Sequence, residues 1–226
     1  MTSRELAPRA LSESLDACAA AATFLSRVYL QSPSGPMLAE LAADGVLAQW
    51  PIQDDEPTVE GLAAIARSVG EPPTPLTELH ADHQRLFLGP ENVLACPYES
   101  VYLNTEHLTF GAETLEVRRW YGRYGLAAPA LGREPDDHIG LELAFVAHLC
   151  LQALDVVDAG EAAGTNDDAV LERAVRALAE FLGDHLLAWS EEFCDHVVGG
   201  ARTEFYRGVG LLTRGLTRRM GQDFTA

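Results

Sequence analysis

The sequence contains no lysine: all 16 of its basic residues are arginine, against 34 acidic residues. This absence excludes a phosphate-binding loop built on lysine and a lysine Schiff base to pyridoxal phosphate. The signatures of several other enzyme classes are also missing, because the chain has no G-x-S-x-G, H-E-x-x-H or G-x-G-x-x-G motif. We therefore expect a protein that binds a partner and is not an enzyme.

Cysteine is scarce, and Cys18, Cys96, Cys150 and Cys194 are scattered singly. The chain has no C-x-x-C pair, which excludes a zinc knuckle and a dithiol redox motif. Cys96 falls in a loop, whereas the other three fall on apolar helical faces, where a buried and reduced thiol is expected. The sequence predicts neither a metal site nor a cofactor.

Long apolar runs are also lacking, and we expect no stretch of membrane-spanning length. Residues 1–9 do not have the basic start and apolar core that a signal peptide requires. These features predict a cytoplasmic protein without stable membrane insertion.

Acidic charge is abundant and unevenly distributed, with a formal net charge of −18. Residues 134–195 carry 15 acidic residues against two arginines, whereas residues 202–226 carry five arginines against two acidic residues. Such a chain repels phosphate, so nucleic acid is not an expected partner. A basic peptide fits better, although the acid content also fits a role in solubility alone.

Helical periodicity runs through most of the chain, and proline and glycine separate its segments. Hydrophobic residues make up 47% of the sequence, and it has no strand alternation of useful length. We predict one all-α domain of about ten helices over residues 1–226. It divides into a helical part over 1–125, a loop over 126–135 and a second helical part over 136–226.

Two departures from regular helix are expected within this domain. Residues 89–104 contain Pro90 and Pro97 and have no helical period, so we expect an irregular segment there. The long helix that begins at Asp168 is expected to bend near Gly183.

An acidic helix start, Glu134-Pro135-Asp136-Asp137-His138, precedes the helical stripe that begins at Ile139. Pro135 presets its own φ, and Asp136 or Asp137 is expected to accept a hydrogen bond from the first turn of that helix. One carboxylate would suffice for capping. The cluster therefore holds more acid and imidazole than a helix start requires.

The run from Glu134 to Leu149 resembles the E-x-x-D-H-h-x-x-E-h signature (h, apolar) of the TorD/DmsD chaperones, which are redox-enzyme maturation proteins. Leu86–Pro90, followed by Pro97–Tyr102, is similar to that family's LF-x-G loop and aromatic S-V-Y element. Residues 181–193 resemble its late F-x-x-x-H-L-x-x-W-x-x-x-F helix. The three matches keep the family's order and span about residues 80–200.

The resemblance implies a TorD-like helical bundle and a chaperone that binds a peptide. In similar proteins the acidic element contributes to recognition of the twin-arginine leader of a molybdoenzyme. Carried over, this points to Asp137 and His138, with Glu134 and Asp136 in support. The chemistry is sound, because a guanidinium prefers a fixed carboxylate that accepts two parallel hydrogen bonds.

The loop before this element is expected to form a second wall of a peptide groove, where aromatic rings offer apolar contact at low entropic cost. The family often carries tryptophan where Tyr98 stands, so this wall differs in detail. The residues expected to line it are Gly89, Pro90, Pro97, Tyr98, Glu99, Ser100 and Tyr102.

The resemblance further implies a client. The expected partners are the twin-arginine leader and the apo form of a molybdopterin oxidoreductase of the dimethyl-sulfoxide-reductase type. The chaperone would hold the leader until the molybdenum cofactor is inserted. A monomer is expected, and its short linkers are compatible with a dimer that exchanges helices.

Each assignment has a structural alternative. Asp137 and His138 fit a purely capping role, and Tyr98 and Tyr102 fit loop-anchoring aromatics. The other notable side chains are expected to be structural: Trp120, Tyr121, Phe181, Trp189 and Phe193 in the core, His185 as a satisfied interior histidine, and Arg118, Arg119 and Arg123 on a solvated face.

Two rival functions remain open. A helical metalloprotein is suggested by His138 and Glu142, which lie one turn apart, but the Glu-x-x-His pairs of di-iron bundles are absent. A nucleotide-binding protein is the second rival, because guanine nucleotide binding is associated with parts of the resembled family. The chain offers no glycine-rich phosphate loop for it.

Overall fold

The computed structural model of the chain describes residues 8–89, 93–104, 109–129, 132, 134–163 and 168–225. These residues form α-helices linked by short π-helical and 3₁₀-helical segments. Within the described ranges no strand is formed, and an isolated antiparallel bridge joins Tyr98 to His138. The predicted all-α fold is confirmed.

The α-helices are α1 (Pro8–Leu30), α2 (Gly35–Leu41), α3 (Glu56–Val69), α4 (Leu76–His83), α5 (Glu99–Leu103), α6 (Ala112–Arg123), α7 (Ile139–Ala163), α8 (Asp168–Phe181), α9 (Leu187–Gly200) and α10 (Glu204–Met220). The shorter segments are η1 (Leu47–Gln49), η2 (Gln84–Leu88), η3 (Leu182–Leu186) and η4 (Gly221–Thr225).

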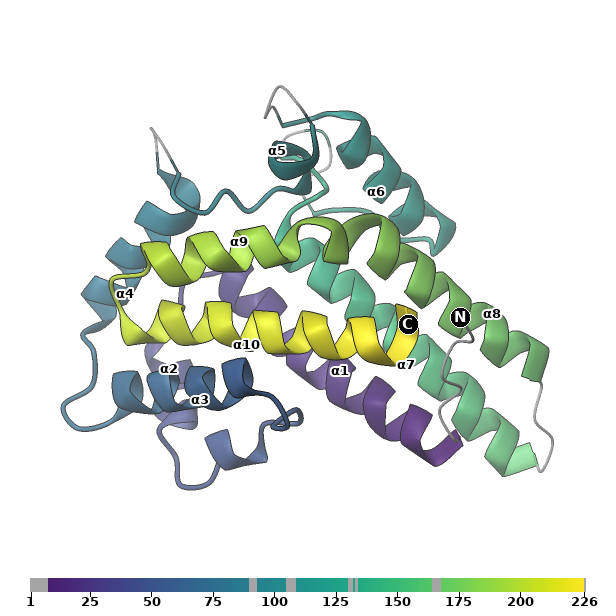
Figure 1. Ribbon diagram of the computed structural model, residues 1–226, viewed down its shortest axis with the longest axis horizontal. Helices are drawn as coiled ribbons and strands as arrows, with labels where there is room; N and C mark the ends of the chain where they lie inside the picture. Colours follow the sequence, from purple (N-terminus) through teal and green to yellow (C-terminus); the bar gives the residue numbers. More distant parts are fainter. Residues whose placement is uncertain are drawn as a thin grey trace.

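Two pairs of long helices build the body of the molecule. The N-terminal helix α1 packs along α7, and α3 packs along the C-terminal helix α10. Figure 1 shows α9 beside α10, with α3 on the other side of α10 and the short helices α5 and α6 beyond α9. Segments far apart in the sequence therefore meet around α7, α9 and α10.

Glycine lets the paired helices approach closely. A Cβ atom added to Gly208 of α10 would lie 2.7 Å from the carbonyl oxygen of Gly61 on α3. A Cβ atom added to Gly140 would lie 3.0 Å from the carbonyl oxygen of Ser26 on α1. Ser26 Oγ also donates a hydrogen bond of 2.6 Å to the Gly140 carbonyl, which fixes the start of α7 against α1.

The core is apolar and aromatic, as predicted. Phe181 and Phe193 are completely buried, and Trp189 is nearly so. Trp120 and Tyr121 of α6 are also buried, so the core assignment of these aromatics is confirmed. The predicted buried thiols, Cys18, Cys150 and Cys194, are buried and unbridged.

Local structure corrects two expectations and confirms a third. The segment over residues 89–104 is not irregular throughout, because α5 occupies Glu99–Leu103. The second helical part begins at Ile139, three residues later than predicted, because residues 136–138 are tied to other segments. The bend expected near Gly183 is present as the π-helical segment η3, where α8 turns into α9 (Figure 1).

The expectation that no apolar stretch reaches membrane-spanning length was wrong. Residues 139–160 of α7 are long and apolar enough to cross a membrane by composition, although we expected no such run. More than half of this stretch is buried inside the protein. A helix surrounded by α1 and α8 has the same apolar composition as a membrane span, and α7 is the central core helix of this fold.

Candidate functional site

Two segments that the sequence marks separately are joined in space. The Tyr98–His138 bridge links the segment before α5 to the acidic helix start. On either side of it, Glu99 N donates to the Asp137 carbonyl over 3.0 Å, and Ile139 N donates to the Pro97 carbonyl over 2.8 Å. The two predicted walls of a peptide site are therefore one continuous piece of structure.

Asp137 holds this junction together from inside. Its side chain is completely buried. Its Oδ2 accepts a 2.8 Å hydrogen bond from Ser100 N, in the first turn of α5, and its Oδ1 accepts one of 2.7 Å from Thr114 Oγ1 of α6. We expected this carboxylate, or that of Asp136, to cap the helix that follows it. Asp137 instead caps α5, a helix that lies 37 residues earlier.

The start of α7 is capped by the imidazole of His138. Its Nδ1 accepts a 3.0 Å hydrogen bond from Gly140 N, so the other ring nitrogen carries the proton in the neutral form. The ring stands edge-on to Tyr98, with ring centres 5.3 Å apart. Burial lowers the pKa of His138 to about 4, and nearby Asp137 opposes that shift. His138 is therefore neutral at pH 7 and does not repel a basic peptide.

Asp136 is also completely buried, and its carboxylate binds an arginine of this chain. Arg118 Nε of α6 donates to Oδ2 over 2.6 Å, and an Nη2 bond of 3.3 Å reaches Oδ1. The hydroxyl of Tyr121 donates to the Asp136 carbonyl over 3.1 Å. Arg118 was expected on a solvated face; its side chain is 36% exposed, and its guanidinium in addition binds this buried acid.

A second acidic group lies beneath α5. Glu99 is 1% exposed, and His185 Nδ1 of η3 lies 3.0 Å from its Oε1. Glu142 of α7 is completely buried, and Trp189 Nε1 donates to its Oε2 over 3.2 Å. His185 is a satisfied interior histidine, as predicted.

The carboxyl groups of Glu99 and Glu142 lie close enough for the charge of one to act on the other. Burial raises the pKa of Glu142 well above its usual range, and Glu99 and Asp137 raise it further. Burial also raises the pKa of Glu99, although its bond with His185 lowers it. Burial and the neighbouring acids therefore favour the protonated form of Glu142.

Only part of the predicted site is open to a ligand. Glu134 is exposed, and Gly89, Tyr98, Tyr102 and His138 are partly exposed. The remaining described members are buried: Pro97, Glu99, Ser100, Asp136 and Asp137. Pro90 lies outside the described residues.

Tyr102 links the surface of the site to the core. Its ring lies against Trp189, with ring centres 5.1 Å apart, and its hydroxyl lies 3.3 Å from His196 Nδ1 of α9. Leu103 beside it is exposed. Tyr102 and Leu103 therefore offer an apolar surface at the end of α5.

Sequence reasoning missed three members of this network. Thr114 was not singled out, Arg118 was assigned to solvent, and Glu142 was considered only as a metal ligand. The position of Glu142 held a usable signal, because an acid one turn after His138 and beside Leu143 falls on the buried stripe of the helix. Neither Thr114 nor Arg118 had such a signal, because their partners come from another segment.

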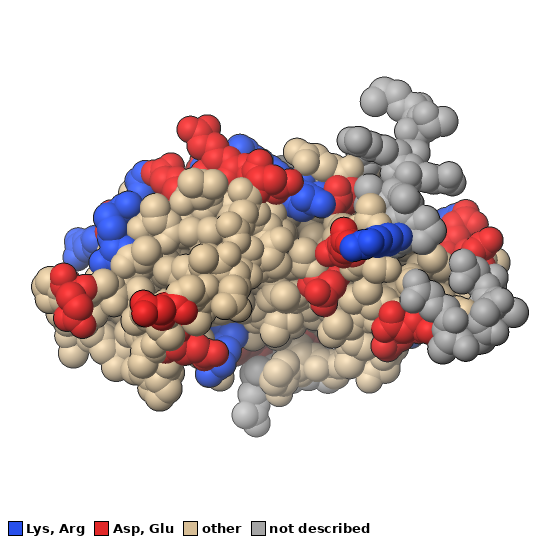
Figure 2. Space-filling model, turned by 90° about the horizontal axis from the view of Figure 1, so that it is seen from below, with Lys and Arg blue, Asp and Glu red and all other residues tan. Residues whose placement is uncertain are grey.

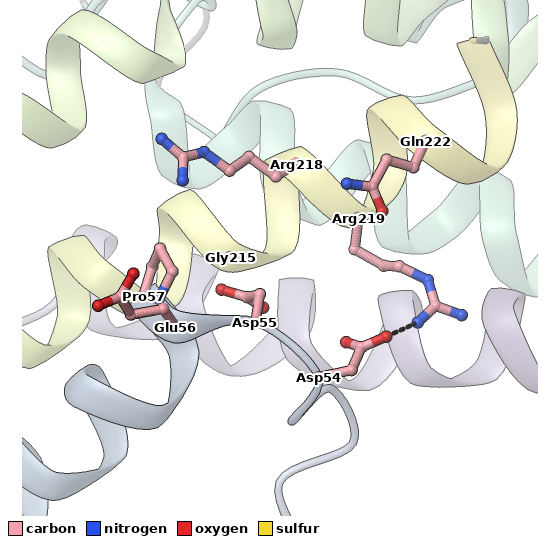
Figure 3. A pocket seen from close by; sticks show the side chains of 8 residues that line it. All are labelled: Asp54, Asp55, Glu56, Pro57, Gly215, Arg218, Arg219 and Gln222. Atoms are coloured by element: carbon pink, nitrogen blue, oxygen red, sulfur yellow. Dashed lines mark hydrogen bonds and ion pairs between the residues drawn. The ribbon is translucent and has the colours of Figure 1, made fainter.

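A separate pocket of about 270 Å³ lies where the start of α3 meets the end of α10 (Figure 3). Two of its acids, Asp54 and Asp55, already have partners in this chain. Arg219 Nη1 binds Asp54 Oδ2 over 2.8 Å, and Asp55 Oδ1 accepts the Thr58 N–H that begins α3. On the face seen in Figure 2, acidic and basic side chains likewise lie among one another and do not form a patch of one sign.

Among the described residues, no group of three or more histidine, cysteine or acidic side chains has the geometry to hold a metal ion. The buried acids Glu99, Asp137 and Glu142 are instead engaged by N–H, O–H and imidazole groups. The arrangement suits the positioning of a short helix and its loop more than the binding of a cation.

Comparison with known proteins adds a family. Residues 53–195 match the family described as nitrate reductase delta subunit. The Tat proofreading chaperone DmsD of Salmonella typhimurium is 29% identical over 203 residues, which cover 88% of this chain and 86% of that protein. The chaperone protein TorD of Aliivibrio fischeri is 32% identical over 136 residues, covering 60% of this chain and 59% of that protein. The matched family range contains both segments that meet at the Tyr98–His138 bridge.

Proposed function

The chain belongs to the TorD/DmsD family of redox-enzyme maturation chaperones, and on this premise we propose that it binds the twin-arginine leader of a molybdopterin oxidoreductase. The client is of the dimethyl-sulfoxide-reductase type. The chaperone acts in the cytoplasm, where it holds the leader and the apo form of the client until the cofactor is inserted. Its action is reversible binding, without making or breaking a covalent bond.

The observation that carries this proposal is the joining of the two segments at Tyr98 and His138. It brings neutral His138, four residues after exposed Glu134, against the ring of Tyr98, four residues before Tyr102. A leader offers arginines followed by an apolar stretch. An acidic end next to an aromatic wall complements both parts of such a peptide.

The site residues divide by burial into two groups. Glu134, His138, Tyr98 and Tyr102, with Gly89, form the contact surface for the leader. The buried members position that surface: Pro97, Glu99, Ser100, Asp136 and Asp137. All of these residues come from one chain, so a monomer is sufficient for binding.

Calorimetric titration with a synthetic twin-arginine leader tests this function. The peptide comes from a molybdoenzyme encoded next to this chain in its source genome. We expect saturable binding with a dissociation constant of about 1 μM, equivalent to roughly 8 kcal/mol. Affinity should fall with salt, because part of the attraction is between charges.

Peptide controls separate recognition of guanidinium from attraction to any positive charge. A leader with both arginines changed to glutamine should not bind. A leader with both changed to lysine keeps the charge and loses the planar fork, and it should bind more weakly. Equal binding of all three peptides, or of none, would exclude a twin-arginine receptor.

Matched protein variants test the placement of the site. Glu134→Gln removes an exposed acid at the proposed surface and should weaken binding by about two- to fivefold, as expected for a solvent-exposed ion pair. Asp158→Asn removes an exposed acid from the far end of α7, about 28 Å along the helix, and should leave the affinity unchanged. Equal losses would show a general effect of charge and would count against this surface.

A further inference from the structure

The carboxylate of Asp136 holds a guanidinium in the arrangement that an arginine receptor requires. Arg118 forms bonds of 2.6 and 3.3 Å from two of its nitrogens to the two carboxylate oxygens. The carboxylate is fully buried, whereas the Arg118 side chain is 36% exposed. Arg118 thus approaches the buried acid from the solvent side.

The acid itself is rigidly placed. Its carbonyl accepts a hydrogen bond from Tyr121, and the neighbouring carboxylate of Asp137 is bonded to Ser100 N and Thr114 Oγ1. Such a carboxylate is already desolvated and oriented, so a guanidinium that reaches it binds without reorganising the protein. Arg118 is the more mobile partner, because its long side chain extends from a helix to the surface.

The other buried acid that pairs with an arginine has a different arrangement. Asp82 binds Arg85, but its Oδ2 also accepts hydrogen bonds from Arg202 N and Thr203 N, just before α10. Arg85 is further fixed by a bond from its guanidinium to the Gly200 carbonyl. Within the described ranges, the bonds of the Arg118 guanidinium go to Asp136, so one exchange of partner releases it.

We propose that Arg118 is a placeholder for an arginine of the leader, which displaces it and takes over the Asp136 carboxylate. This inference rests on the proposed function and specifies how its site is regulated. The exchange replaces one guanidinium–carboxylate pair by an identical pair, so no buried charge is left uncompensated. The released Arg118 moves into solvent, where a charged side chain is readily accommodated.

A placeholder lowers the apparent affinity for the leader, because only the fraction of molecules with a free carboxylate can bind. If the open state is populated to about 10% or less, removing the placeholder should raise the affinity at least about tenfold. The placeholder also makes binding selective for arginine, since a ligand that cannot satisfy the buried carboxylate does not displace Arg118.

The test compares Arg118→Met with Arg119→Met by titration with the leader. Arg119 is the next residue on α6 and is exposed, so the two variants lose the same charge from the same helix. We expect Arg118→Met to bind at least about tenfold more tightly than the native chain, with little change for Arg119→Met. Equal gains would show only the altered net charge, and an unchanged or weaker Arg118→Met would overturn the proposal.

The native chain provides a second measurement that does not depend on the folding of a variant. Arginine Nε–H signals are observed by NMR after ¹⁵N labelling, and the leader is added unlabelled. Displacement should move the Arg118 signal to the position of a solvated guanidinium as the leader saturates. A signal that stays in place at saturation would overturn the placeholder and leave the proposed function intact, whereas a lack of leader binding would remove both.

Discussion

At the scale of single residues, three neighbouring side chains of the acidic helix start have three different partners. Asp136 binds Arg118, Asp137 caps α5, and His138 caps α7. A sequence pattern shows which groups are available for capping, but hydrogen bonds depend on which segments fold against them. The apparent surplus of acid thus serves contacts with other segments.

Glu142 gives a prediction for the pH dependence of stability. Its pKa is raised by burial, so the native state holds a proton that the unfolded chain releases above about pH 4.3. The stability that this proton contributes is present at low pH and is lost as the pH rises toward the raised pKa. Glu142→Gln keeps an acceptor for Trp189 without titrating.

The free energy of unfolding of the native chain should therefore fall relative to that of Glu142→Gln as pH rises above about 4.3, by up to about 1.4 kcal/mol per pH unit. Urea unfolding of both proteins between about pH 5 and pH 8 measures the difference. Glu180→Gln, an exposed site on α8, controls for the amide substitution. Parallel profiles for the native chain and Glu142→Gln would show that Glu142 is ionised in the folded protein.

At the scale of elements, α5 depends on its polar contacts. A helix of five residues is too short to be stable alone, and its first turn is held by the buried carboxylate of Asp137. Its Glu99 side chain is bound by His185 of η3. The short helix that carries Tyr102 and directly follows Tyr98 is therefore positioned by the acidic helix start.

Asp137→Ala should release the start of α5 before the rest of the protein. The Ser100 amide loses its acceptor, so its hydrogen exchange should accelerate by about tenfold or more, equivalent to the 1–2 kcal/mol typical of a lost cap. Amide exchange followed by NMR measures this directly. Asp55→Ala is the matched control, because Asp55 caps α3 through Thr58 N and should affect only that helix. Protection of Ser100 that survives in Asp137→Ala would contradict this role of Asp137.

The helices and core could be predicted from the sequence to a large extent. Periodicity was sufficient to predict α7 and the burial of the aromatic stripe of Phe181, Trp189 and Phe193, because the spacing of apolar residues in a long helix shows which face is buried. Periodicity was insufficient to predict α5, because this helix has little more than one turn. Periodicity likewise identified Arg118 as polar but could not reveal a partner 18 residues away that only tertiary packing supplies.

At the scale of the whole molecule, charge is largely balanced where helices meet. On α10, Arg207 binds Glu60, Arg214 binds Asp195 and Arg219 binds Asp54, so the basic C-terminal segment is paired with acids of other elements. The acidic residues in excess of the arginines therefore lie on other surfaces of the protein. The proposed leader site lies where α5, α6 and α7 come together, away from the α3–α10 pocket.

The central claim is that a twin-arginine leader binds where the segment around Tyr98 meets the acidic helix start. Photo-crosslinking tests it most directly, with a benzoylphenylalanine placed beside the two arginines of the leader and the attachment sites mapped by mass spectrometry. We predict crosslinks within residues 93–104, 134–140 and α6, and none from a leader whose arginines are glutamine. Crosslinks at Asp54–Pro57 and Arg218, or attachment that ignores the arginines, would contradict the account.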